Sequence, residues 1–212
     1  MQTVYRRGFA TAGIREITAA AGVAQGSFTN HFASKEDFGV AVIDHYFEQI
    51  RGVIARTLRD ETLDPMARLH AYFDAIIALF ADLNWHYGCL AGNMALEASE
   101  HSETIRHRLV AIFAEWSVPF ADAVRDAQKL GHVRPDLDPD EVGAALLESW
   151  HGAMLRMKVE RTSEPLERFR QFVLPALLGV QDAGSSPFQT RLSDRQRQKP
   201  KPKPRKQKGK PK

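Results

Sequence analysis

The sequence predicts an all-α protein, because helical periodicity runs along nearly the whole chain. Apolar residues recur at three- and four-residue steps up to about residue 180, and no segment alternates with period two for long enough to make a convincing strand. Asp-Pro pairs at residues 64–65 and 138–139 mark helix starts, with Asp as the N-cap and Pro at the first helical position. We expect about nine helices in all.

Gly13–Phe38 predicts two short helices around a tight turn, followed by the start of a longer helix. The apolar face of the first helix consists of Ile14, Ile17 and Ala21. Gly22 can then take the left-handed conformation that ends a helix. The second helix, roughly Gln25–Phe32, spans ~12 Å at ~1.5 Å per residue, which fits a DNA major groove ~12 Å wide. The stretch therefore predicts a helix-turn-helix whose second helix reads DNA.

The exposed side chains of this stretch suit contacts with DNA. The candidates are Gln25, Gly26, Ser27, Asn30, His31 and Lys35. Gln25 and Asn30 can bond adenine edges in bidentate fashion, and Ser27 can contact either a base or a phosphate. The glycine lets the helix N-terminus approach DNA closely, while His31 and Lys35 are expected to meet phosphates. The alternative for each residue is an ordinary solvated side chain.

The residues from Gly8 to about Phe38 follow the order GFxxxxIREIxxxAGVxxGSFxxHFxSKExF. This order resembles the N-terminal domain of TetR-type transcriptional repressors. The resemblance implies a homodimer on a palindromic operator in double-stranded DNA, released by a small organic effector that binds the C-terminal helices. It also implies that the helix after the reading helix transmits the effector signal, and that the last two long helices, about 139–160 and 165–179, form the dimer.

Three features depart from the usual TetR-like pattern. The motif begins Thr11-Ala12-Gly13 where Thr-Ser or Thr-Gly is common, so we expect Thr11 to take the capping or phosphate-contact role one residue early. Thr29 stands where the family often has a tyrosine that reaches a phosphate, and is assigned the same contact with a shorter side chain. Only MQTVYRRG precedes Phe9, and we expect a misplaced start codon rather than a true stub of the first helix.

The whole chain divides into three expected domains. Residues 1–45 are assigned to DNA binding, 46–181 to effector binding and dimerisation, and 182–212 to a disordered basic tail. A connector helix from Ser34 to about Arg59 joins the first two, with an apolar residue at every fourth position. Residues 183–212 contain eleven Lys or Arg and one acid. The tail therefore either neutralises DNA phosphates or is a solubilising extension.

The middle helices are expected to enclose an effector cavity lined by aromatic side chains and a few polar groups. The candidates are Phe73, Ile77, Trp85, His86, Cys89, Asn93, Trp116, Phe120, Trp150, His151 and Met154. Core packing is the competing explanation for each aromatic. Cys89 is the single cysteine. It fits a small buried hydrophobe, whereas a pKa lowered by His86 or by a helix N-terminus would make it a reactive sensor.

Sequence motifs of enzymes are not found in the chain, which has no HExxH, GxSxG, GxGxxG or phosphate-binding loop. The pairs Glu103–His107 and Glu97–His101 fit solvated surface pairs, so no metal or cofactor is expected. With no apolar run of membrane-spanning length and no signal-peptide pattern, we expect a cytoplasmic, non-enzymatic regulator. The alternative is a helical small-molecule- or metal-binding protein without specific operator binding.

Overall fold

The computed structural model describes residues 1–180, and these residues form helices without any strand. This confirms the predicted all-α class. The predicted disordered tail, with its two possible roles, lies outside the described residues. Within the described part of the chain, no helix is long and apolar enough to cross a membrane.

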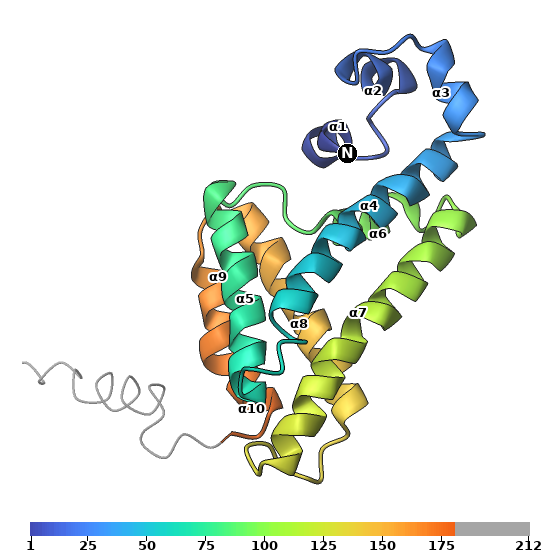
Figure 1. The fold of residues 1–212 in the computed structure, drawn as a ribbon. Coiled ribbons are helices and arrows are strands. Elements are labelled where there is room, and N and C mark those ends of the chain that lie inside the picture. Colours follow the sequence, from blue (N-terminus) through green and yellow to red (C-terminus); the bar gives the residue numbers. More distant parts are fainter. Residues whose placement is uncertain (181–212) are drawn as a thin grey trace, which may run out of the picture. The chain divides into compact units, whose positions relative to one another are not determined.

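The first four helices form the predicted helix-turn-helix and its connector. They are α1 Gln2–Arg7, α2 Ile14–Ala20, α3 Gly26–His31 and α4 Lys35–Arg56. Figure 1 shows α1, α2 and α3 gathered near the N-terminal end of α4. Gly22 has a φ of 69°, the left-handed conformation expected where α2 ends. Ser34 caps α4, because its Oγ accepts the N–H of Asp37 at 3.0 Å.

The predicted cap on α2 is wrong. Its N-cap is Gly13, which has no side chain to offer, and Thr11 Oγ1 instead donates to the carbonyl of Arg7 at the end of α1. The Thr11 hydroxyl therefore ties the short first helix to the turn that precedes α2. α1 itself is held by Val4, which is fully buried, and by Tyr5, whose hydroxyl donates to the carbonyl of Gly88 at 2.7 Å.

The remaining helices build the larger part of the described chain. They are α5 Pro65–Asp82, α6 Leu90–Ala98, α7 Glu103–Lys129, α8 Pro139–Glu160, α9 Glu164–Arg168, the π-helical η1 Phe169–Val173, and α10 Leu174–Leu177. The predicted caps Asp64 and Asp138 are confirmed by their side-chain bonds to first-turn amides, and Ser102 caps α7 in the same way. The expected single last helix is interrupted by η1, because Pro175 has no N–H to donate four residues back.

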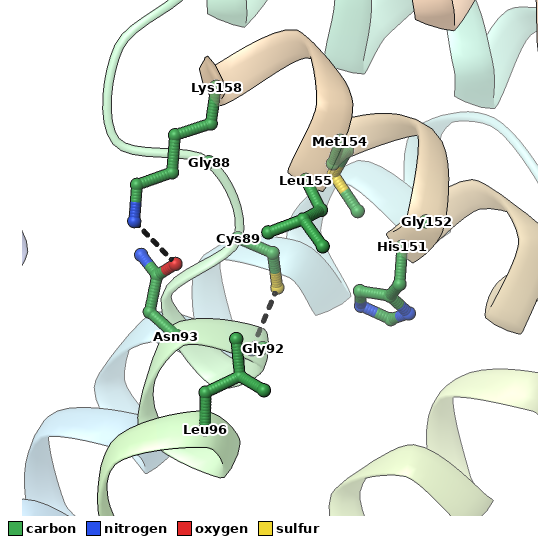
Figure 2. A pocket seen from close by; sticks show the side chains of 10 residues that line it. All are labelled: Gly88, Cys89, Gly92, Asn93, Leu96, His151, Gly152, Met154, Leu155 and Lys158. Carbon is green, nitrogen blue, oxygen red and sulfur yellow. Dashed lines mark hydrogen bonds between the residues drawn. The ribbon is translucent and has the colours of Figure 1, made fainter.

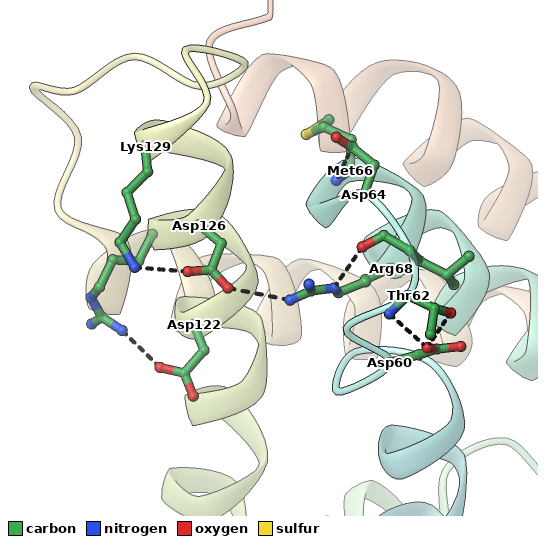
Figure 3. Close-up of polar contacts among 10 residues, drawn as sticks. Asp60, Thr62, Asp64, Met66, Arg68, Asp122, Asp126 and Lys129 are labelled. Atoms are coloured by element: carbon green, nitrogen blue, oxygen red, sulfur yellow. Dashed lines mark hydrogen bonds and ion pairs between the residues drawn. The ribbon is translucent and has the colours of Figure 1, made fainter.

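Helix α7 organises the larger part by packing against α4, α5, α6 and α8. In the core, Trp116 Nε1 donates to the hydroxyl of Tyr72 at 2.9 Å and joins α7 to α5. Near the C-terminal end of α7, Arg68 of α5 donates to Asp126 at 3.2 Å and to the carbonyl of Leu63 at 3.0 Å (Figure 3). These contacts fix α5 against α7, and α7 packs in turn against α6 and α8, which line the cavity described below.

Helices α7 and α8 approach each other closely at Gly143. A Cβ on Gly143 would lie 2.7 Å from the backbone nitrogen of Ala121, which cannot move aside as a flexible side chain can. We predict that Gly143→Ala lowers the free energy of unfolding by about 1–3 kcal/mol through overpacking. Urea denaturation followed by circular dichroism measures this value.

Gly52→Ala on α4 is the matched control. The nearest atom to a Cβ there is Arg56 Nη1 at 3.4 Å, the far end of a flexible side chain. This change is expected to be neutral or to stabilise by up to about 1 kcal/mol, since alanine favours the helix. Equal unfolding free energies for the two variants would contradict the close α7–α8 crossing.

Candidate DNA-reading helix and effector cavity

The predicted DNA-contacting residues of the reading helix lie mostly on its exposed face. Gln25, Gly26, Thr29, Asn30 and His31 are exposed and Ser27 is half-buried. The opposite face is fixed by Phe28, which is buried and lies 5.3 Å from Phe32 and 5.5 Å from Phe38, centroid to centroid. The polar face is therefore presented by a helix whose rotation about its axis is set by aromatic packing.

Besides Thr11, whose hydroxyl bonds to Arg7 and whose phosphate contact stays a prediction, two of the predicted phosphate contacts make bonds within the protein. Lys35 Nζ donates to the carbonyl of Ala10 at 3.1 Å and lies 5.0 Å from the centroid of the Phe9 ring. Thr29 Oγ1 donates to the carbonyl of Gly26 at 3.0 Å. Lys35 thus holds the segment before α2 against α4, and the DNA contacts of both residues stay predictions.

A cavity of ≈ 230 Å³ lies between α6, the residues just before it, and α8 (Figure 2). We call it the α6–α8 cavity. Of the predicted effector contacts, it brings together Cys89, Asn93, His151 and Met154. It is completed by residues that sequence reasoning did not single out: Gly88, Gly92, Leu96, Gly152, Leu155 and Lys158. Apolar walls with a few polar groups suit a small organic ligand.

The predicted aromatic contacts do not line this cavity. Phe73, Phe120 and Trp150 are fully buried and pack together, with the Phe73 centroid 4.8 Å from that of Trp150. Trp116 is also buried, and its ring lies edge-on to that of His151 at 5.2 Å. These four residues form the core beneath the cavity.

The other predicted contacts lie outside the α6–α8 cavity as well. Ile77 and Trp85 are half-buried against the core, while His86 is exposed and its Nδ1 lies 2.7 Å from the carbonyl of Asn84. His86 is therefore not the imidazole that faces the thiol of Cys89. That imidazole belongs to His151, which lies far along the chain on α8.

Cys89 is the N-cap of α6, and its sulfur is the polar centre of the cavity. Sγ accepts the N–H of Gly92 at 3.4 Å and the hydroxyl proton of Tyr46 at 3.5 Å. His151 Nδ1 lies 2.9 Å from the carbonyl of Leu147, and Nε2 is buried without a hydrogen-bond partner among the described residues. A buried, unpaired nitrogen beside a cavity is available to a polar group of a ligand.

The thiol and the imidazole shift each other's protonation. Burial alone would raise the pKa of the Cys89 thiol, but the charge of His151 and the hydrogen bonds from Tyr46 and Gly92 outweigh it and leave that pKa lowered. Burial alone would lower the pKa of His151, but the neighbouring thiolate raises it above the ordinary value. Each group therefore stabilises the charged form of the other, so a larger share of Cys89 is present as the nucleophilic thiolate than for a cysteine without such a neighbour.

Comparison with known proteins agrees with this architecture. Residues 1–42 match the family described as bacterial regulatory proteins, tetR family, and residues 65–173 match the tetracyclin repressor-like C-terminal domain. The chain is 42% identical over 177 residues to the HTH-type transcriptional repressor DhaR of Mycobacterium sp. (strain GP1), covering 84% of this chain and 87% of that protein.

Two further similarities support the same assignment. The chain is 32% identical over 169 residues to the transcriptional regulator AcuR of Cereibacter sphaeroides, covering 80% of this chain and 77% of that protein. The crystal structure of the regulatory protein TetR from Rhodobacter sphaeroides matches with a TM-score of 0.75 at 31% identity, covering 80% of this chain and 94% of that one.

Proposed function

Because the chain belongs to the TetR family of bacterial transcriptional regulators, we propose that it represses by binding a palindromic operator as a homodimer. A small organic effector in the α6–α8 cavity releases it. The observation that carries this proposal is the hydrogen bond from Tyr46 to Cys89. Tyr46 lies on α4, the helix that follows the reading helix, and Cys89 lines the cavity. A ligand that displaces the sulfur acts directly on α4, the helix that carries α1, α2 and α3. We call these three helices the reading head.

Release requires only that the effector binds one arrangement of the reading heads better than the other. Such coupling is typically ~1–3 kcal/mol, or about 5- to 150-fold in operator affinity. An effector with an apolar body fits the walls formed by Leu96, Met154 and Leu155. A polar or electrophilic group on it would meet the sulfur of Cys89 or the unpaired Nε2 of His151.

The proposed dimer uses α8 and the helix formed by α9, η1 and α10. Both present large apolar side chains to solvent: Leu155 and Val159 on α8 are 49% and 72% exposed, and Phe172 in η1 is 44% exposed. Burying such residues against a second copy is favourable. A two-fold symmetric pair also matches the two half-sites of a palindrome.

Gln25→Ala tests whether α3 reads bases. We predict a loss of about 1–3 kcal/mol of discrimination at one operator position, because an adenine-edge contact is removed. Lys35→Ala is expected to weaken binding to all sequences alike, since its contact is to phosphate. Fluorescence anisotropy on duplexes from the DNA flanking the protein's own gene, each with single-base changes, measures both effects.

A scrambled duplex of the same length and salt concentration is the control, because phosphate contacts depend strongly on salt. Equal losses for Gln25→Ala on the operator and on the scrambled duplex would remove its base-reading role. If the unmodified chain binds both duplexes equally, the alternative of a helical ligand-binding protein without operator specificity is correct.

Val159→Glu tests the dimer. We predict that a buried carboxylate at the α8 contact lowers the light-scattering mass at micromolar concentration from two chains to one. Val118→Glu on α7 is the matched control, since Val118 is also an exposed valine, at 48%, but lies outside the proposed interface. A single-chain mass for the unmodified protein would contradict dimerisation through any surface.

A further inference from the structure

A second cavity, of ≈ 320 Å³, lies where α1 meets the effector-binding helices. Its walls come from α1, from the loop before α6, from α6 and from the C-terminal end of α8. We call it the α1–α8 cavity. It shares Asn93 and Lys158 with the α6–α8 cavity, and the bond from Lys158 Nζ to Asn93 Oδ1 at 2.9 Å is part of the wall between them.

The α1–α8 cavity has an unbalanced charge. Four cationic side chains line it, Arg6, Arg7, Lys158 and Arg161, against the single carboxylate of Glu97. Arg7 is neutralised by Glu16, 2.7 Å away. The other three cations have no carboxylate partner among residues 1–180.

The acceptors that Arg161 and Lys158 bond to are neutral oxygens, so these bonds do not neutralise the positive charge of the two side chains. Arg161 donates to the carbonyl of Trp85 at 3.4 Å and Lys158 to the side-chain amide of Asn93. Glu97 cannot serve all three, because one of its oxygens already accepts the N–H of Ala10 at 3.0 Å. A cation near the C-terminal end of a helix interacts favourably with the helix dipole, and this explains the position of each cation taken alone. The helix dipole does not explain why cations from the ends of two different helices, α1 and α8, line the same cavity.

We propose that the α1–α8 cavity binds the oxyanion group of a small acid, a phosphate or a carboxylate, through Arg6, Lys158 and Arg161. Guanidinium groups bind both oxyanions through paired, charge-assisted hydrogen bonds, and an ammonium adds a third donor. The bound anion would bridge α1 of the reading head to α8 of the effector-binding helices. This site adjoins the proposed effector site and shares Lys158 with it, and its occupancy would favour one arrangement of the two parts.

Calorimetric titration of the full chain tests the proposal, with inorganic phosphate in one arm and succinate in the other. Chloride keeps the ionic strength constant. The expected result is saturable binding of at least one anion at one site per chain, weakened at least about tenfold in the double variant Arg6→Gln, Arg161→Gln by the loss of charge-assisted bonds. The arm that saturates identifies the acid as tetrahedral or planar.

Arg56→Gln is the control variant, because Arg56 is exposed on α4 and lies outside both the cavity and the helices of the proposed dimer. It should bind the anion as the unmodified chain does, and thermal melting should show all variants folded. Saturation by neither anion, or equal affinity in the double variant and the unmodified chain, would overturn the proposal. Since no DNA is present, a negative result here leaves the proposed repressor function standing.

Discussion

The hydrogen bond from Tyr46 to the sulfur of Cys89 is the contact on which the proposed mechanism depends. Tyr46 is buried, and burial first, followed by the nearby thiolate, raises the pKa of its hydroxyl well above the ordinary value, so it remains a proton donor. Its ring also packs against Tyr5 at 6.2 Å and Trp116 at 6.5 Å. One side chain of α4 thus contacts the first helix, the core and Cys89, which lines the cavity.

Two further contacts reach the same region from the reading head. Tyr5 donates to the carbonyl of Gly88, and Glu97 of α6 accepts the N–H of Ala10. The loop before α6, which Tyr5 holds at Gly88, is strained, since Trp85 and Tyr87 have φ values of 61° and 72°, which residues other than glycine seldom adopt. A ligand that lets this loop relax would change the contacts of both α1 and α4. The loop and α1 would thus form a second path, beside α4, by which a bound ligand could affect the reading head.

Local chemistry made most of the fold predictable, whereas the site depended on contacts distant in sequence. Helix starts can be recognised in the sequence because a cap bonds to an amide no more than three residues away. The capping residues are Ser34, Asp64, Ser102 and Asp138. The contact of Cys89 with His151 joins residues far apart in sequence and has no local signature, so sequence analysis named His86 as the neighbouring imidazole. The helix N-terminus at Cys89, the other predicted cause of a lowered pKa, is a local feature and is present in α6. Large aromatics such as Phe73 were assigned to the cavity because composition cannot distinguish a wall from the core beneath it.

Filling the α6–α8 cavity is expected to lower the affinity of the DNA-reading helices for the operator. Because Cys89 is the only cysteine, iodoacetamide can place one carbamidomethyl group in that cavity at a known atom. Operator affinity measured before and after this reaction, with Cys89→Ser treated in parallel, tests the claim directly. We predict that the modified protein binds the operator at least about fivefold more weakly while the treated serine variant is unchanged. Equal operator affinity of modified and unmodified protein would contradict it.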